Sequence, residues 1–234
     1  MNRKGLLLVA FVSLALWGQT ADHPVAITAE PSHHLYIEND QVRVFQVEAA
    51  PHAATLVHQH DHDYIFVSLG ASDIRNEVVG REPVELKLED GEVHWSKGGF
   101  AHKIVNLSDQ PFRNVTIELL RAQGAATPAT EPPSRYCNPG SQTACIAERY
   151  LFCTDKVCVS DVTMGPGAAT MRHTHSTDHM VVAVTDVQMT DEIEGQPPVE
   201  RRIKAGDAVY VPAGITHRLI NGPESCRFIT LQFK

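Results

Sequence analysis

Apolar and polar residues alternate over short stretches of the chain, and this period of two predicts β-strands. Residues 42–47 and 115–119 alternate strictly, whereas residues 64–69 form an almost continuous apolar run, typical of a strand that is buried on both faces. Similar runs follow in the second half, at residues 180–184, 208–211 and 228–233. Gly and Pro interrupt the runs at short intervals, and no long segment has a helical period. The pattern predicts an all-β fold, a sandwich or a barrel.

The pattern occurs twice. Residues 41–106 align without a gap with residues 156–221, at a constant offset of 115 positions. Pro51 falls on Pro166 and Gly91 on Gly206, which indicates one fold used in tandem. We therefore expect an N-terminal barrel over residues 25–120 and a C-terminal barrel over residues 150–234. Residues 121–149, rich in Ala, Thr and Pro at their start, are expected to form a linker and a cysteine-containing bridge.

Composition narrows the class of protein. The chain has 43% hydrophobic and 21% charged residues, as an ordinary globular protein does, and its formal net charge is −8. An acidic surface repels phosphate backbones, so we expect no nucleic-acid partner.

The first residues are typical of an export signal. Arg3 and Lys4 precede an apolar run at residues 5–17 that is too short to span a bilayer, and small and polar residues follow. Residues 1–21 are predicted to be a signal peptide, with an uncleaved anchor as the alternative. We expect a secreted or periplasmic protein with no membrane contact after signal removal. Its five cysteines all lie beyond residue 136 and predict two disulfides and one free thiol, with the pairing open.

Thirteen histidines are the main chemical signal. A His-x-His pair occurs in each copy, and a third histidine follows its second member after 42 residues in both. Side chains two apart on a strand point to the same face, so each pair can converge with the third ring on one ion. The six are His58, His60 and His102 in the first copy and His173, His175 and His217 in the second.

Three imidazoles suit a divalent transition metal (Fe, Mn, Zn, Ni or Cu) and leave coordination positions open. We therefore predict one metal ion as the cofactor of each copy.

Two segments resemble the motifs of the cupin superfamily. Residues 206–221 match the second cupin motif, Gly, five residues, Pro-x-Gly, two residues, His, three residues, Asn, at every fixed position. Residues 91–106 match all but the proline, which is Lys97, and residues 167–175 open the first motif correctly. The chain thus resembles a two-domain cupin, which implies two jelly-roll-like barrels.

The resemblance is incomplete at the position of the family's metal-binding Glu. Asp63 and Tyr64 stand there in the first copy, and Asp178 and His179 in the second. A shorter carboxylate, a fourth imidazole and a bare three-histidine site all stay open. This chain lacks the Glu-bearing pattern of the oxalate decarboxylases and oxidases. It is more similar to three-histidine cupins, whose chemistry includes thiol and diketone dioxygenation.

Two classes of function follow from these patterns. The first is an exported metalloenzyme, oxygenase-like or isomerase/lyase-like, that acts on a small organic molecule. The second is a non-catalytic small-ligand-binding or structural cupin module, which would be favoured by a closed shell of four protein ligands. A homodimer is expected only by analogy with other cupins. Asn106 and Asn221, which end the second motif, are expected to hold turns rather than to touch a ligand.

Overall fold

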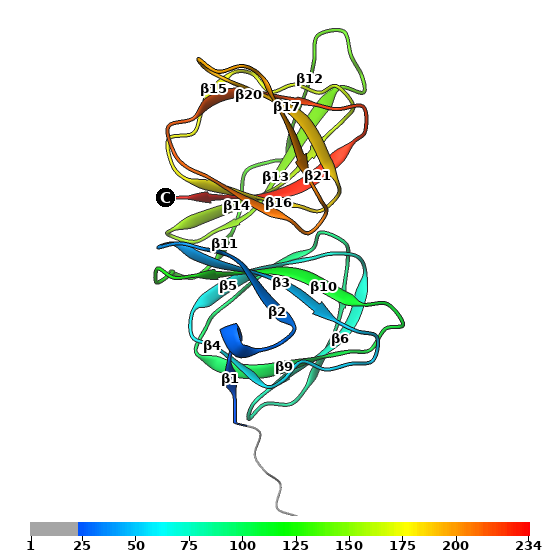
Figure 1. Ribbon diagram of the computed structural model, residues 1–234, viewed down its shortest axis with the longest axis vertical. Coiled ribbons are helices and arrows are strands. Elements are labelled where there is room, and N and C mark those ends of the chain that lie inside the picture. Colours follow the sequence, from blue (N-terminus) through cyan, green and yellow to red (C-terminus); the bar gives the residue numbers. More distant parts are fainter. Residues whose placement is uncertain (1–22) are drawn as a thin grey trace, which may run out of the picture.

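The computed structural model describes residues 23–234, which form two β-barrels that lie one above the other in Figure 1. The all-β prediction is confirmed: the described residues contain 21 strands and one short 3-10 helix, η1 (Ile27–Ala29). Within them, no helix is long and apolar enough to cross a membrane. The predicted signal peptide at residues 1–21 lies outside the described residues.

The N-terminal barrel consists of two five-stranded sheets, in the orders β1-β4-β9-β6-β7 and β2-β3-β10-β5-β8. All pairs are antiparallel except β1 with β4. The strands of the first sheet are β1 (Val25–Ala26), β4 (His58–His60), β9 (Phe100–Asn106), β6 (Ser72–Val78) and β7 (Val84–Leu88). Those of the second are β2 (His33–Glu38), β3 (Val42–Ala49), β10 (Phe112–Leu119), β5 (Asp63–Ser68) and β8 (Val93–Ser96).

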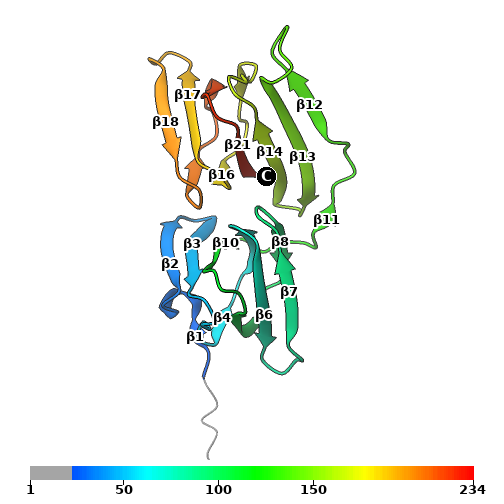
Figure 2. The ribbon, with the colours of Figure 1, turned by 90° about the vertical axis from the view of Figure 1, so that its right-hand side faces the viewer.

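The C-terminal barrel repeats this plan with a seven-stranded and a four-stranded sheet (Figure 2). The larger sheet has the order β11-β13-β14-β21-β16-β19, with β12 also paired to β13, and the smaller has the order β15-β20-β17-β18. The larger sheet contains β11 (Thr127–Pro128), β12 (Ser134–Cys137), β13 (Cys145–Cys153), β14 (Val157–Met164), β21 (Cys226–Phe233), β16 (His179–Ala183) and β19 (Ala208–Val211). The smaller contains β15 (His173–Thr174), β20 (Thr216–Asn221), β17 (Val187–Ile193) and β18 (Val199–Ile203).

The segment between the copies is more ordered than the sequence pattern indicates. The boundary expected at residue 150 falls inside β13, and the expected bridge at residues 121–149 contains β11, β12 and the first part of β13. Cross-strand pairing explains this order, because β12 pairs along β13 from Ser134 opposite Glu148 to Cys137 opposite Cys145. The bridge therefore forms an edge of the C-terminal sheet.

The two barrels pack against each other through matching strands. β3, β5 and β10 face β14, β16 and β21 across one apolar cluster, to which seven buried positions of the first copy and their seven counterparts in the second contribute, together with Val184 and Ala208. The run at residues 64–69 is almost continuously apolar because one face of β5 lines its own barrel while the other faces the second barrel. The first set is Val42, Val44, Ile65, Val67, Val115, Ile117 and Leu119, and the second is Val157, Val159, Met180, Val182, Ile229, Leu231 and Phe233.

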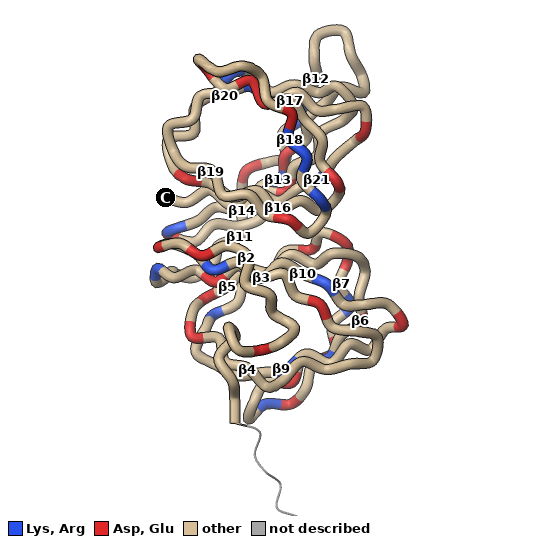
Figure 3. The backbone as a smooth tube through the Cα atoms, in the orientation of Figure 1, with Lys and Arg blue, Asp and Glu red and all other residues tan. Residues whose placement is uncertain are grey.

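Charged residues do not gather on one face in the view of Figure 3, where Lys and Arg are interspersed with Asp and Glu. Arg227 joins the two barrels by donating from Nη1 to the Asp90 carbonyl oxygen at 2.9 Å, while its Nε donates to Asp161 Oδ1 at 3.0 Å.

The motif asparagines hold turns, as predicted. Asn106 Nδ2 donates to three backbone oxygens, at 2.8 to 3.2 Å, and Asn221 Nδ2 does the same at 2.8 to 3.1 Å. The carbonyls belong to Ala49, Ala50 and Gln110 in the first copy, and to Met164, Gly165 and Glu224 in the second.

The cysteine prediction is confirmed. Cys137 is bonded to Cys145 and Cys153 to Cys158, and Cys226 is free and buried. Both bonds join residues that are paired across neighbouring antiparallel strands. Disulfides are typical of proteins from oxidising compartments.

Candidate functional site

The C-terminal barrel brings three histidines together at its mouth. His173 on β15 pairs in register with His217 on β20, and His175 follows β15 directly. The Nε2 atom of His175 lies 3.1 Å from Nε2 of His173 and 3.1 Å from Nε2 of His217. These three nitrogens lie within 4.8 Å of one another, an arrangement that could hold a metal ion.

The geometry of the three rings fits a bound cation. For metal–nitrogen bonds of about 2.0–2.1 Å, two nitrogens that share an ion lie about 3.0–3.4 Å apart. On the outer side of the rings, the Nδ1 atoms of His173 and His217 lie 2.9 Å from the Met171 carbonyl oxygen and from Asp191 Oδ1. Since carbonyl and carboxylate oxygens only accept, each Nδ1 carries the proton and each Nε2 lone pair is free to bind a metal.

Burial keeps the central ring neutral. Together with the neighbouring rings of His179, His173 and His217, which disfavour a second positive charge, burial lowers the pKa of His175 to about 4. A neutral imidazole is the form that binds a metal ion.

The structure places Asp178 and His179 outside this triad. Asp178 accepts hydrogen bonds from Gln41 Nε2 at 2.6 Å, from Tyr210 Oη at 2.6 Å and from the Ala213 N–H at 2.8 Å. His179 stacks on His175, with ring centroids 3.8 Å apart and planes inclined by 22°. Both residues therefore support the site, one by holding the motif turn and one by fixing a ring.

The N-terminal barrel gathers the corresponding rings more deeply. His58 on β4 pairs in register with His102 on β9, and Nε2 of His60 lies 3.1 Å from Nε2 of His102. The Nδ1 atoms of His58 and His102 lie 2.9 Å from the Leu56 carbonyl oxygen and 2.7 Å from Asn76 Oδ1. His58 Nε2 is buried and has no hydrogen-bond partner among residues 23–234, as expected of an atom placed to bind a cation.

Burial also keeps these rings neutral. Burial and the charge of neighbouring histidines lower the pKa of His58 to about 4 and that of His102 to about 3, and they lower the pKa of His60 as well.

Asp63 and Tyr64 lie beside this group in the same way as their C-terminal counterparts. Asp63 accepts hydrogen bonds from Lys97 Nζ at 3.0 Å and from the Gly98 N–H at 2.9 Å. Tyr64 stacks on His60, with ring centroids 4.0 Å apart and planes inclined by 18°. Lys97, which stands at the position of the motif proline, thus forms an ion pair with Asp63.

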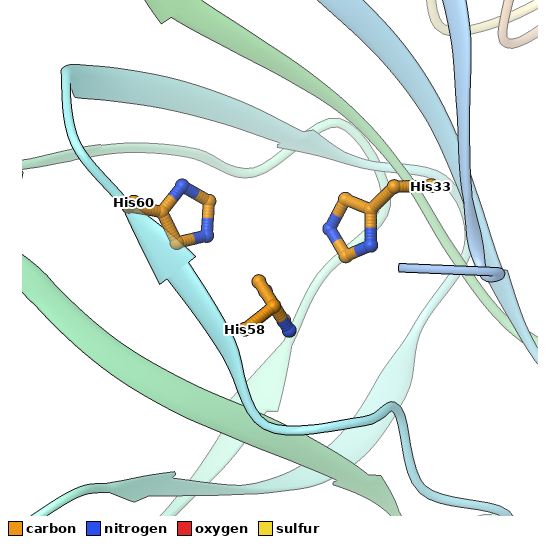
Figure 4. Close-up of side chains that lie close together, drawn as sticks. All are labelled: His33, His58 and His60. Carbon is orange, nitrogen blue, oxygen red and sulfur yellow. The ribbon is translucent and has the colours of Figure 1, made fainter. Parts of the chain in front are cut away.

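A further histidine, which the sequence pattern does not single out, lies with two of the three N-terminal histidines in one group that does not include His102. The ligand atoms of His33, His58 and His60 lie within 4.8 Å of one another, and Figure 4 shows the three rings around one centre. His33 begins β2, before the segment that repeats. The outer-side partners Asn76 and Asp191 were also missed, although they occupy equivalent positions of the two copies.

The two sites differ in the space beside the histidines. A cavity of about 390 Å³ reaches His173, His175 and His179 in the C-terminal barrel, whereas the N-terminal histidines line a cavity of only about 50 Å³. The larger cavity lies within the range of about 300–1,000 Å³ that is typical of pockets for small organic molecules, and the smaller one lies well below it.

Residues 160–231 match the family model of the cupin domain. Solved structures with a similar fold include AerE from Microcystis aeruginosa, at 13% identity over 88% of this chain and 98% of that chain, with a TM-score of 0.59. A cupin 2 conserved barrel domain protein from Leptotrichia buccalis is 11% identical over 86% of this chain and 88% of that chain, with a TM-score of 0.54. A variant of oxalate decarboxylase from Bacillus subtilis is 13% identical over 83% of this chain and 69% of that chain, with a TM-score of 0.55.

At these identities the structural likeness shows the fold alone. A comparison with curated protein sequences finds no match. A segment of the C-terminal half thus matches the cupin domain by sequence, and the N-terminal half repeats the same β-barrel, so the chain has the fold of a two-domain cupin.

Proposed function

We propose that the protein is an exported metalloenzyme whose C-terminal barrel acts on a small organic molecule. The observation that carries this proposal is the open cavity of about 390 Å³ that reaches His173 and His175, which form one group with His217. Three protein ligands leave coordination positions free, and the cavity gives a substrate access to them.

In this proposal each residue of the C-terminal site has a defined task. The Nε2 atoms of His173, His175 and His217 hold the ion, and Asp191 fixes the orientation of His217 through its Nδ1. His179 keeps the ring of His175 in place by stacking. A divalent transition metal, once bound, would supply Lewis-acid or dioxygen chemistry.

The lining of the cavity favours a largely apolar, uncharged substrate. Apolar side chains, among them Ile146, Val162 and Phe228, form most of the wall. No Lys or Arg occurs among the described residues that line it, and Glu148 adds a negative charge. Arg172 and Arg218, which flank the motif histidines, both face Glu192 Oε2, at 3.8 and 3.7 Å. A small dianion such as oxalate would therefore find no cationic partner in the wall.

Metal analysis tests the proposal first. Elemental mass spectrometry of the purified protein should find between about one and two transition-metal ions per chain. The double substitution His173→Ala and His217→Ala should remove the C-terminal ion and leave the other. Unchanged metal loading would contradict the assignment of these ligands.

An activity screen tests the second half of the proposal. The metal-loaded protein should consume oxygen, or convert the compound without oxygen, in the presence of a small neutral thiol, diketone or aromatic compound, and the double variant should not. A protein that binds such compounds at the metal but never converts them would support the non-catalytic binding module instead.

Export is a separate part of the proposal, supported by the two disulfides and by the apolar run at residues 5–17. Expression of the full chain in a bacterium should yield a periplasmic or secreted protein, the intact mass of which lacks about 21 residues. A full-length mass in the membrane fraction would favour the uncleaved anchor. The homodimer stays a prediction, which light scattering of the purified chain can test.

A further inference from the structure

We propose that the N-terminal barrel holds its own ion in a closed shell of four imidazoles, His33, His58, His60 and His102, with a structural role. The C-terminal barrel alone would then meet a substrate. This division of roles goes beyond the function proposed above and does not depend on any reaction.

His33 lies on a strand outside both cupin motifs, and its ligand atom lies within 4.8 Å of those of His58 and His60. His102 is not in that group but is joined to it through His60, at 3.1 Å between the Nε2 atoms, so a bound ion would have to draw His33 and His102 together. Its ring centroid lies 4.6 Å from that of His58, which is also the distance between the centroids of His58 and His102. His33 Nδ1 lies 2.6 Å from Glu30 Oε2, so the ring nitrogen left for a cation is Nε2. Figure 4 shows the ring of His33 directed toward His58 and His60.

Glu30 fixes this arrangement from behind. Its carboxylate accepts hydrogen bonds from the N–H groups of Ser32 at 2.8 Å and Leu56 at 3.0 Å, in addition to its contact with His33. Burial alone would raise the pKa of Glu30, but these hydrogen bonds hold it below its usual value. Because the Leu56 carbonyl oxygen in turn accepts from His58 Nδ1, one buried carboxylate orients two of the four rings.

The space between the rings limits what can bind. All four histidines are buried and line the same cavity of about 50 Å³. This volume is well below the roughly 300–1,000 Å³ of pockets that bind small organic molecules, so the cavity has little room beside an ion. A metal ion that is surrounded by protein ligands and closed to substrate is typical of a structural site.

The C-terminal barrel serves as an internal comparison. His33 pairs with Val47 on β3, and Glu148 pairs with Val162 at the matching position of β14. Glu148 borders the open cavity instead of adding a fourth ring to the triad there. The proposed four-imidazole site and the three-imidazole site therefore differ at one strand position, which is His33 in the first barrel and Glu148 in the second.

The experiment uses the full chain with His173→Ala and His217→Ala, so that only the N-terminal site can bind metal. Loaded with Co²⁺, this parent should show the strong visible absorption of a four-coordinate ion, and X-ray absorption should count four imidazole nitrogens. Failure of the C-terminal proposal would not change this result, because that site is absent from the parent.

Adding His33→Ala to this parent should weaken the absorption and speed the loss of Co²⁺ to a chelator at least about tenfold, since even an outer partner of a metal ligand is worth about 10–100-fold in affinity. His34→Ala, at the exposed neighbouring residue, is the matched control and should leave both readouts unchanged. If His33→Ala does not fold by circular dichroism, His33→Gln replaces it. No bound Co²⁺, three imidazoles in the parent, or equal loss rates in parent and His33 variant would overturn the proposal.

Discussion

At the scale of single residues, the candidate ligands depend on partners that never face the ion. Nδ1 of His102 is held by Asn76 and Nδ1 of His217 by Asp191, at equivalent positions of the two copies. Both partners accept the imidazole proton, but only Asp191 carries a negative charge, and Arg201 Nε lies 3.3 Å from its second oxygen. The charged partner raises the basicity of His217 as a ligand.

We predict that Asp191→Ala lowers the metal affinity of the C-terminal site by about 10–100-fold, because His217 loses the acceptor that fixes its tautomer. Asp191→Asn, which copies the N-terminal barrel, should cost less, since the amide oxygen can still accept. Competition with a chelating dye measures both affinities, and the N-terminal site of the same chain is the control. Equal affinities in all three proteins would show that Asp191 does not orient His217.

Cys226 gives a second prediction at this scale. Its thiol is buried, and desolvation raises its pKa to about 11. At pH 8 the reactive thiolate is therefore about one part in a thousand, and the native protein should resist iodoacetamide. Mass spectrometry should find one modified cysteine after unfolding without reductant and five after reduction. Fast labelling of the native protein would contradict the buried position.

At the scale of strands, β10 and β21 carry the same arrangement of apolar residues. Ile117 on β10 and Leu231 on β21 are fully buried, and both face the other barrel. Alternate residues of the same strands face the interior of their own barrel, as Thr116 does at the N-terminal cavity. Each strand thus serves two cores at once.

We predict that Ile117→Ala and Leu231→Ala each reduce the free energy of unfolding by about 2–5 kcal/mol, because each leaves a cavity in the shared cluster. Leu35→Ala, at an exposed position of β2, should change it by less than about 0.5 kcal/mol. Urea unfolding of the three variants measures the difference. A loss confined to one of the two cluster variants would mean that the interface is not shared equally.

At the scale of the whole molecule, the two barrels cover each other's apolar sheets. The buried positions that both copies contribute to the shared cluster would lie on an open surface if one barrel stood alone. Polar contacts between the barrels fix their relative position. Gln46 Nε2, for example, donates to the Gly206 carbonyl oxygen at 3.1 Å and to Asp207 Oδ1 at 3.0 Å. A contiguous apolar face of this kind drives association when it is exposed.

We predict that residues 126–234 expressed alone form a dimer or larger species through this face, whereas Val159→Lys with Leu231→Lys in the same fragment reduces association. Light scattering after gel filtration measures the mass of both. A monomeric unmodified fragment would contradict the view that the barrels depend on each other.

The sequence by itself determined much of the architecture. Strand positions, the duplication and the spacing of the six motif histidines follow from local periodicity and from separation along the chain, which need no knowledge of contacts. The spacing of His58, His60 and His102 predicts that they can converge because two of them share a strand face. The number of disulfides, the turn role of the motif asparagines and the resemblance to cupins were also readable at this level.

How each site is completed depends on contacts between distant strands. Asp178 accepts a hydrogen bond from the Ala213 N–H of the motif loop, and His179 stacks on His175, although both residues stand near the position of the family's metal-binding Glu. His33 joins the N-terminal group because β2 pairs with β3 in a register that puts its first residue over the cavity. The physical reason is that register and the packing of distant strands decide which side chains meet and how much space they leave, and a one-residue shift would turn each side chain to the opposite face.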